Sequence, residues 1–234
     1  MKVKNKKTKQ IASKKNHKEQ LKANRRNQQN FERAEPILVE KPTILIVCEG
    51  ENTEPSYFKQ FRLSSATIKP VGEGYNTTSL VKRAIEMARQ AAFDQVWCVF
   101  DKDDFSEKDF NKAIKIAEAN NFGVAYSNQA FEYWLILHFE DHQGGGIHRD
   151  AYNDKINKIL KPHNITYDGT KRKEITENLF ELLDGLDDKT KKERKILAID
   201  RAKRNYNELD HVNPSKEESS TTVFKLVEEL LKYV

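Results

Sequence analysis

Acidic residues come directly after two apolar segments of the sequence, where their carboxylates could hold a metal ion. The segment 43–48 (TILIVC) leads into Glu49, and the segment 95–100 (QVWCVF) leads into Asp101. The acidic side chains at these two places are Glu49, Glu51, Glu54, Asp101, Asp103 and Asp104. Ligand sets made only of oxygen suit Mg²⁺ or Mn²⁺, which bind through one or two carboxylates and keep several waters. These residue types therefore predict divalent-metal chemistry if the fold brings the two groups together.

An alternation of strands and helices is expected to position these acids. The segments 43–48 and 95–100 are short, continuous apolar runs, as expected for strands covered on both faces. Weaker strands are predicted at 67–71 and 123–127. Helices are predicted from apolar periodicity over 56–61, 80–88, 110–117 and 130–139. The alternation predicts an α/β fold with a parallel sheet of about four strands flanked by helices.

After Phe139 the pattern of the sequence changes. A loop with three glycines (QGGGIH, 143–148) is followed only by segments with helical periodicity. The helices predicted there cover 152–160, 174–183, 190–209 and 221–233. We therefore divide the chain into a basic, disordered or extended arm (1–38), an α/β core (39–141) and a helical C-terminal region that packs on the core (142–234).

The two acidic groups are expected to meet at one edge of the sheet. In open parallel sheets, ligands bind beyond the carboxyl ends of the strands, near the point where strand order reverses. The first and third strands are neighbours, or nearly so, in the commonest strand orders, so Glu49 and Asp101 would face one another. Such crowding of like charges is unfavourable unless a cation neutralises it. An alternative stays open, because acids after strands also stabilise the first turn of the next helix.

A zinc site is disfavoured, because no pair of Cys or His residues has ligand spacing. His138, His142 and His148 lie near Glu140 in the sequence and would be the candidates for a transition-metal site. A histidine on a helix is more often structural, so this interpretation is the weaker one.

The positive charge of the chain is concentrated at its N-terminus. The chain has 41 basic and 36 acidic residues, for a net charge of +5. Residues 1–26 hold 11 of the basic residues and the acid Glu19, so residues 27–234 keep 30 basic against 35 acidic residues. Such an arm has too little apolar surface to fold alone, and its expected partner is DNA or RNA. The residues expected to contact phosphates are Lys4, Lys6, Lys7, Lys9, Lys14, Lys15, Arg25 and Arg26. A solubility tail without a partner is the alternative.

Membrane attachment and export are not expected. The sequence has no run of 18 apolar residues, no lipidation signal and no apolar stretch near its start. Cys48 and Cys98 lie inside apolar segments and are interpreted as core residues of a protein in a reducing compartment. A cytoplasmic location is therefore expected.

The pairing of Glu49-Gly50 with Asp101-Lys102-Asp103 resembles the Toprim domain of topoisomerases, bacterial primases and some nucleases. More closely, the sequence resembles the RloB family of prokaryotic proteins. The stretches that carry the resemblance are ILIVCEGENTEPSYFKQFR (44–62), VWCVFDKDDF (96–105), SNQAFEYWLILHF (127–139) and NPS…TTVFKLVE (213–228). Two places depart from the usual family pattern. Gln129 stands where a proline is usual, and KEESS (216–220) is inserted between the NPS and TTV elements.

The resemblance implies a Toprim-like core and a Mg²⁺- or Mn²⁺-dependent nuclease in restriction or abortive-infection loci, working with an ATPase partner. On this interpretation Asp101 and Asp103 would hold the metal, and Glu49 would act as general acid or base or as a further ligand. Glu54 would assist as a ligand. The residues expected to support the site are Gly50, Lys102, Asp104, Asn128 and Glu132. Glu132 is equally well interpreted as a charge at a helix N-terminus.

The same sequence bears on three other functions. A non-catalytic protein that binds nucleic acid or regulates an ATPase complex is the main alternative, and turnover of nucleic acid by the protein alone distinguishes it. A receiver domain is disfavoured, because it needs paired acids after the first strand and Glu49 is followed by Gly50. A P-loop ATPase is excluded, because no glycine-rich loop ends in Lys followed by Ser or Thr.

Overall fold

The computed structural model describes Glu19 and residues 41–70, 77–103, 106–142 and 145–234. Lys41–Val234 form one compact unit, distinct from Met1–Glu40. The basic residues predicted to contact nucleic acid lie outside the described residues, as does Asp104.

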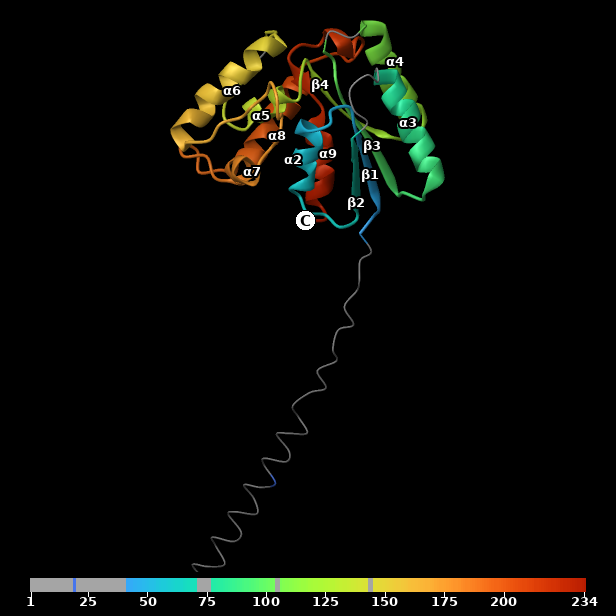
Figure 1. The fold of residues 1–234 in the computed structure, drawn as a ribbon, viewed down its shortest axis with the longest axis horizontal. Helices are drawn as coiled ribbons and strands as arrows, with labels where there is room; N and C mark the ends of the chain where they lie inside the picture. The colour runs from blue at the N-terminus through green and yellow to red at the C-terminus, as the bar shows by residue number, and fades with distance from the viewer. Residues whose placement is uncertain (1–18, 20–40, 71–76, 104–105, 143–144) are drawn as a thin grey trace, which may run out of the picture. The chain divides into compact units, whose positions relative to one another are not determined.

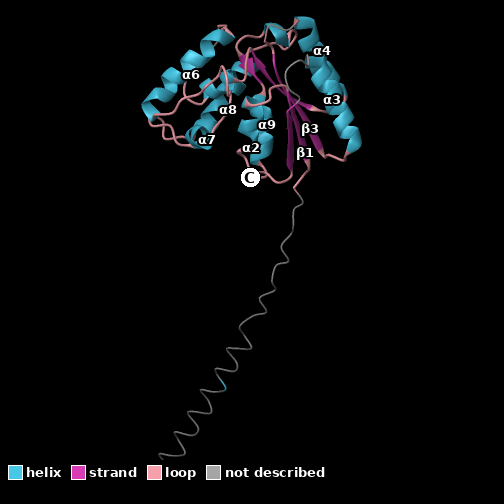
Figure 2. Ribbon diagram, in the orientation of Figure 1, coloured by secondary structure: helices cyan, strands magenta, loops and turns pink. Residues whose placement is uncertain are grey.

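A five-stranded sheet forms the centre of the unit Lys41–Val234, in the order β2-β1-β3-β4-β5 (Figures 1 and 2). The strands are β1 (Ile44–Cys48), β2 (Ala66–Pro70), β3 (Gln95–Asp101), β4 (Gly123–Asn128) and β5 (Ser220–Thr221). The first four run parallel, and β5 runs antiparallel to β4. The predicted α/β class and the four predicted strands are confirmed, and each strand end lies within one residue of its predicted position.

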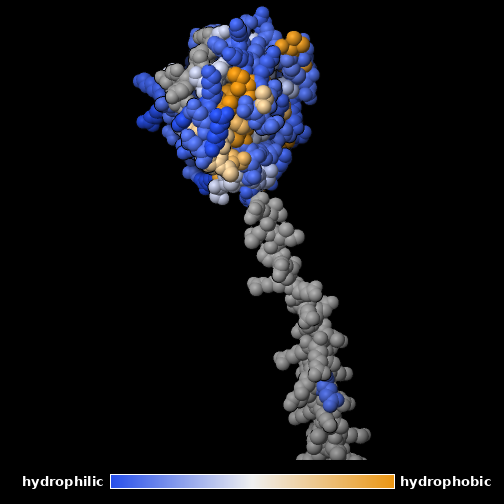
Figure 3. Space-filling view, turned by 90° about the vertical axis from the view of Figure 1, so that its right-hand side faces the viewer, coloured by the Kyte–Doolittle hydropathy of each residue, from blue (hydrophilic) through white to orange (hydrophobic). Residues whose placement is uncertain are grey.

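Helices cover both faces of the sheet, which explains why β1 is apolar throughout. Helices α3 (Thr77–Gln90) and α4 (Glu107–Ala119) lie on one face, and α2 (Thr53–Lys59) and α9 (Val223–Leu231) lie on the other (Figure 1). Alternate side chains of a strand point to opposite faces. Ile44, Ile46 and Cys48 accordingly join one buried cluster, and Leu45 and Val47 join the other. The side of the unit that carries α3 and α4 is largely hydrophilic, with a band of apolar side chains near its middle (Figure 3).

The remaining helices pack mainly against one another. These are α5 (Glu132–Leu137), α6 (Tyr152–Leu160), α7 (Glu177–Asp184) and α8 (Arg194–Asn207), with short 3₁₀ helices at Arg149–Ala151, Lys161–His163 and Pro214–Lys216. The predicted helices exist, although α5, α7, α8 and α9 are shorter than predicted. None of the helices in the described ranges is both long and apolar enough to cross a membrane.

One prediction about the C-terminal region was wrong, because this region also supplies a strand. We expected only helices after Asp150, but Ser220–Thr221 form β5 at the edge of the sheet. Side-chain and backbone contacts fix its position: the Thr221 hydroxyl lies 3.0 Å from the Ser127 hydroxyl, and the Thr222 backbone amide donates to the Tyr126 carbonyl at 2.8 Å. A strand of two residues has no periodicity of its own, so the sequence pattern did not reveal it.

Candidate active site

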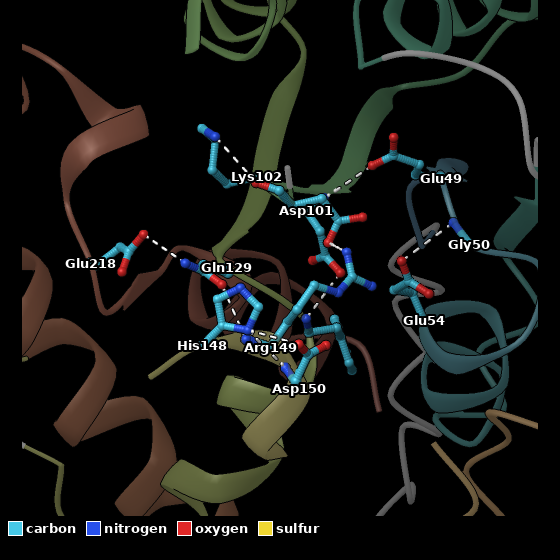
Figure 4. Close-up of polar contacts among 12 residues, drawn as sticks. Glu49, Gly50, Glu54, Asp101, Lys102, Gln129, His148, Arg149, Asp150 and Glu218 are labelled. Atoms are coloured by element: carbon cyan, nitrogen blue, oxygen red, sulfur yellow. Dashed lines mark hydrogen bonds and ion pairs between the residues drawn. The ribbon is translucent and has the colours of Figure 1, made fainter. Parts of the chain in front are cut away.

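Glu49 and Asp101 lie side by side at the carboxyl edge of the sheet. Strands β1 and β3 are neighbours, with Cys48 opposite Val99, so the residues that follow them emerge together. The Glu49 backbone amide still donates to the Val99 carbonyl at 2.9 Å. The Glu49 Oε2 accepts a hydrogen bond from the Asp101 backbone amide at 3.1 Å (Figure 4). The predicted meeting of these two strand ends is confirmed.

Gly50 lets the Glu54 carboxylate approach the backbone closely. Glu54 lies in the first turn of α2 and is 4% exposed. Its Oε1 accepts a hydrogen bond from the Gly50 amide at 3.3 Å, and a side chain at Gly50 would collide with that carboxylate. The Glu-Gly pair thus places two carboxyl groups, those of Glu49 and Glu54, in one turn.

Asp101 and Asp103 are oriented by the segment that follows β4. The Asp101 Oδ2 accepts a hydrogen bond from the Phe131 amide at 3.1 Å, and the Asp103 amide donates to the Gln129 carbonyl at 3.1 Å. Asp103 has a φ of 41°, in the left-handed region that Asp occupies more readily than most residues. The chain therefore turns sharply at Asp103.

An arginine from the C-terminal region is paired with this acidic group. The guanidinium of Arg149 forms an ion pair with the Asp103 carboxylate, and the two side chains are 32% and 23% exposed (Figure 4). The Arg149 backbone amide donates to Gln129 Oε1 at 3.1 Å. Gln129 thus contacts both partners of the ion pair, Asp103 through its backbone and Arg149 through its side chain.

The carboxyl groups at this edge hold their protons more tightly than ordinary acids. Burial raises the pKa of Glu49 to about 7, and the charges of Asp103 and Glu54 add to the effect of burial. Burial also raises the pKa of Glu54 to about 7, with the charges of Glu132 and Asp103 acting in the same direction. The pKa of Asp101 lies well above its usual range, first because of burial and then because of the Glu54 and Asp103 charges. A divalent cation bound here would lower the pKa values of these carboxyl groups, because its positive charge stabilises their ionised forms.

The side chains present suit such a cation in type, although they do not surround one point. Among the described residues, no group of three or more His, Cys, Asp or Glu side chains has the arrangement of a metal site. Asp103 is turned toward Arg149, and Asp101 Oδ2 accepts from the Phe131 amide. The Glu49 Oε1, by contrast, is buried without a hydrogen-bond partner. An oxygen acceptor buried in this way fits a role as a ligand to a hard cation.

The other predicted site residues are spread around this edge. Glu132 accepts a hydrogen bond from the Tyr167 hydroxyl at 2.7 Å and acts electrostatically on Glu54 and Asp101. The Lys102 ammonium donates to the Asp103 backbone carbonyl at 3.2 Å and points away from the side chains of Glu49, Glu54 and Asp101 (Figure 4). The side-chain amide of Asn128 donates through its Nδ2 to the Pro214 carbonyl at 2.9 Å, toward the C-terminal segment.

The three histidines that follow α5 contact separate partners. His138 is fully buried, with its Nδ1 2.9 Å from the Trp134 carbonyl oxygen. Burial lowers the pKa of His138 to about 3, so its ring is neutral at physiological pH. His142 contacts the Tyr133 hydroxyl, and His148 contacts Asp150.

Sequence reasoning missed Arg149, Gln129 and Tyr167. Arg149 is one of 41 basic residues and follows a glycine-rich loop, so neither its type nor its spacing marked it. Tyr167 lies in a loop far from the acids in the sequence and contacts both Glu132 and Thr53. Gln129 stands out in the sequence as a departure from the family resemblance, but its contacts with Asp103 and Arg149 exist only in the folded chain.

Comparison with known proteins gives a family. The model of a family described as RloB-like protein matches residues 44–230. This match includes β1 to β5 and α2 to α8 in full, and with them Glu49, Asp101, Asp103 and Arg149. No curated protein and no solved structure matches the chain.

Proposed function

Because the chain belongs to the RloB-like family, we propose that it is a Mg²⁺- or Mn²⁺-dependent nuclease that hydrolyses phosphodiester bonds of DNA or RNA. The observation that supports this function best is the gathering of acids from two neighbouring strand ends, where the Glu49 carboxylate accepts a hydrogen bond from the Asp101 backbone amide. We further propose that it acts in prokaryotic anti-phage or abortive-infection defence, in the cytoplasm, together with an ATPase partner protein.

The roles of the chain's own residues follow from their positions. Asp101 and Asp103 would hold the metal, which, when bound, polarises a phosphoryl oxygen and stabilises the charge that develops on it. Glu49, with a pKa near 7, holds and releases a proton at neutral pH, which suits a general acid or base. Glu54 is the additional ligand, anchored by the Gly50 amide.

A direct experiment tests this function. The purified full chain is incubated with Mg²⁺ or Mn²⁺ and with a panel of plasmid, single-stranded DNA, transfer RNA and messenger RNA. Cleavage that needs the metal and that chelation by EDTA stops would support the proposal. If the protein binds one of these nucleic acids but leaves all of them uncleaved, with or without an ATPase partner, the nuclease proposal is wrong.

A second candidate function is a non-catalytic one, in which the site only binds nucleic acid or a partner protein. The observation that favours it is the Arg149–Asp103 ion pair, because Arg149 neutralises an acid that the nuclease would need as a ligand. The same panel separates the two functions, since a binding protein retards nucleic acids on a gel without turning them over.

Deleting residues 1–26 is expected to weaken nucleic-acid binding more at low salt than at high salt. The segment carries 11 basic residues, and each phosphate contact contributes roughly 0.7 to 0.9 to the slope of log K against log salt concentration. Fluorescence anisotropy at several salt concentrations measures this slope for the full and the shortened chain. Parallel lines for the two proteins would show that the segment contacts no phosphates.

A further inference from the structure

We propose that Arg149 is a phosphate-binding residue of this site. Its ion pair with Asp103 is a resting contact, which it leaves when a divalent cation binds Asp103. The inference rests on the proposed function and adds to it a residue and a change of partners.

The position of Arg149 is built into the fold. It begins the 3₁₀ helix Arg149–Ala151, and its backbone amide is held by the Gln129 side chain at 3.1 Å. Its guanidinium contacts Asp103, and its side chain as a whole is 32% exposed, so solvent reaches part of it. In Figure 4 it points into the space between Asp101 and Glu54. A substrate held at the acids would therefore lie within its reach.

Gln129 links Arg149 to the acids and to the C-terminal segment. Its backbone carbonyl accepts from the Asp103 amide, its Oε1 accepts from the Arg149 amide, and its Nε2 donates to Glu218 at 2.8 Å. Gln129 is one of the two places where the sequence departs from the family resemblance, and its partner Glu218 lies in the other, the insert 216–220. A proline at 129 has no side-chain amide and would make neither side-chain bond. The Gln129 side chain thus holds the backbone of Arg149, and Glu218 fixes the other end of that side-chain amide.

The charges explain why Arg149 would change partners. A guanidinium binds carboxylates and phosphates with the same planar fork, so the two groups are interchangeable partners for it. A divalent cation competes for Asp103 with twice the charge of Arg149. It also brings a phosphate to the same place, because Mg²⁺ and Mn²⁺ bind phosphate oxygens together with carboxylates. The guanidinium released from Asp103 is then free to bind that phosphate.

The test compares Arg149→Gln with the wild-type chain in two measurements. Isothermal titration with Mn²⁺ should give about fivefold tighter binding for Arg149→Gln, because the competing ion pair is gone. Binding of fluorescent DNA and RNA oligonucleotides in Ca²⁺, which supports binding without turnover in many such sites, should weaken about tenfold. Without divalent cation the two proteins should bind the oligonucleotides alike. Arg149→Lys keeps the positive charge but lacks the planar guanidinium, so it should keep part of the affinity for oligonucleotides that Arg149→Gln loses.

Two control variants make the result specific. Arg62→Gln removes an arginine–glutamate ion pair at the opposite edge of the sheet, before β2, and should change neither measurement. Asp101→Asn should lose Mn²⁺ binding. If Asp101→Asn loses Mn²⁺ while Arg149→Gln behaves as the wild type in either measurement, the inference about Arg149 is overturned and the proposed function stands. If Asp101→Asn binds Mn²⁺ as the wild type does, the proposed function fails and the inference about Arg149 fails with it.

Discussion

Asp101→Asn is expected to reduce metal-dependent cleavage roughly a thousandfold while leaving the fold intact. A bound metal supplies several kcal/mol of transition-state stabilisation, and each 1.36 kcal/mol is a factor of ten in rate. The Asn side chain has nearly the same shape, and its amide oxygen can still accept from the Phe131 amide that now binds Asp101 Oδ2. The variant also removes a carboxyl group whose pKa is raised by burial, so its stability should not fall. Initial rates on the best substrate of the panel measure the loss.

Asp154→Asn is the matched control for this variant. Asp154 is exposed on α6, so its replacement by Asn makes the same chemical change away from the carboxyl edge of the sheet. It should retain the wild-type rate, and circular dichroism should give superimposable spectra for all three proteins. A folded Asp101→Asn variant that cleaves at the wild-type rate would rule out Asp101 as a metal ligand.

Glu54→Gln is expected to stabilise the metal-free protein at alkaline pH and to have little effect at acidic pH. The pKa of Glu54 rises from 4.5 in the unfolded chain to about 7 in the folded protein. Below pH 4.5 both states are protonated, so the carboxyl group costs no stability. As the pH rises from 4.5 through 7, the unfolded state loses its proton first, and stability falls by roughly 3 kcal/mol. Glutamine has no proton to lose, so the variant keeps that stability.

Urea denaturation at pH 4.5 and pH 8 in EDTA measures this difference. Glu51→Gln is the control, because Glu51 lies in the same turn and is exposed. It should show no comparable gain at either pH. The prediction is contradicted if Glu54→Gln and the wild type have equal free energies of unfolding at pH 8. Mn²⁺ should narrow the gap at pH 8, since it stabilises the ionised wild-type site.

Local patterns predicted the part of the site that belongs to the sheet. The apolar runs that became β1 and β3 were long enough to identify, and the geometry of parallel strands then required Glu49 and Asp101 to emerge at one edge. Gly50 was part of the same signal, and its close contact with Glu54 gives that signal a physical reason.

Contacts between distant segments were not predictable in the same way. Asp103 and Arg149 are 46 positions apart, and their ion pair depends on the left-handed turn at Asp103 and on the Gln129 side chain. Strand β5 pairs with β4 across more than 90 positions through two residues. Such contacts are set by the packing of the C-terminal helices, which no periodicity in the sequence records.

Anomalous diffraction from crystals soaked in Mn²⁺ would locate the ion on which the proposed chemistry depends. We expect a strong peak within coordination distance of Asp101, Asp103 and the Oε1 of Glu49, with the Arg149 guanidinium displaced from Asp103. A map without manganese at these carboxylates, in which Arg149 still occupies Asp103, would contradict the metal-dependent mechanism.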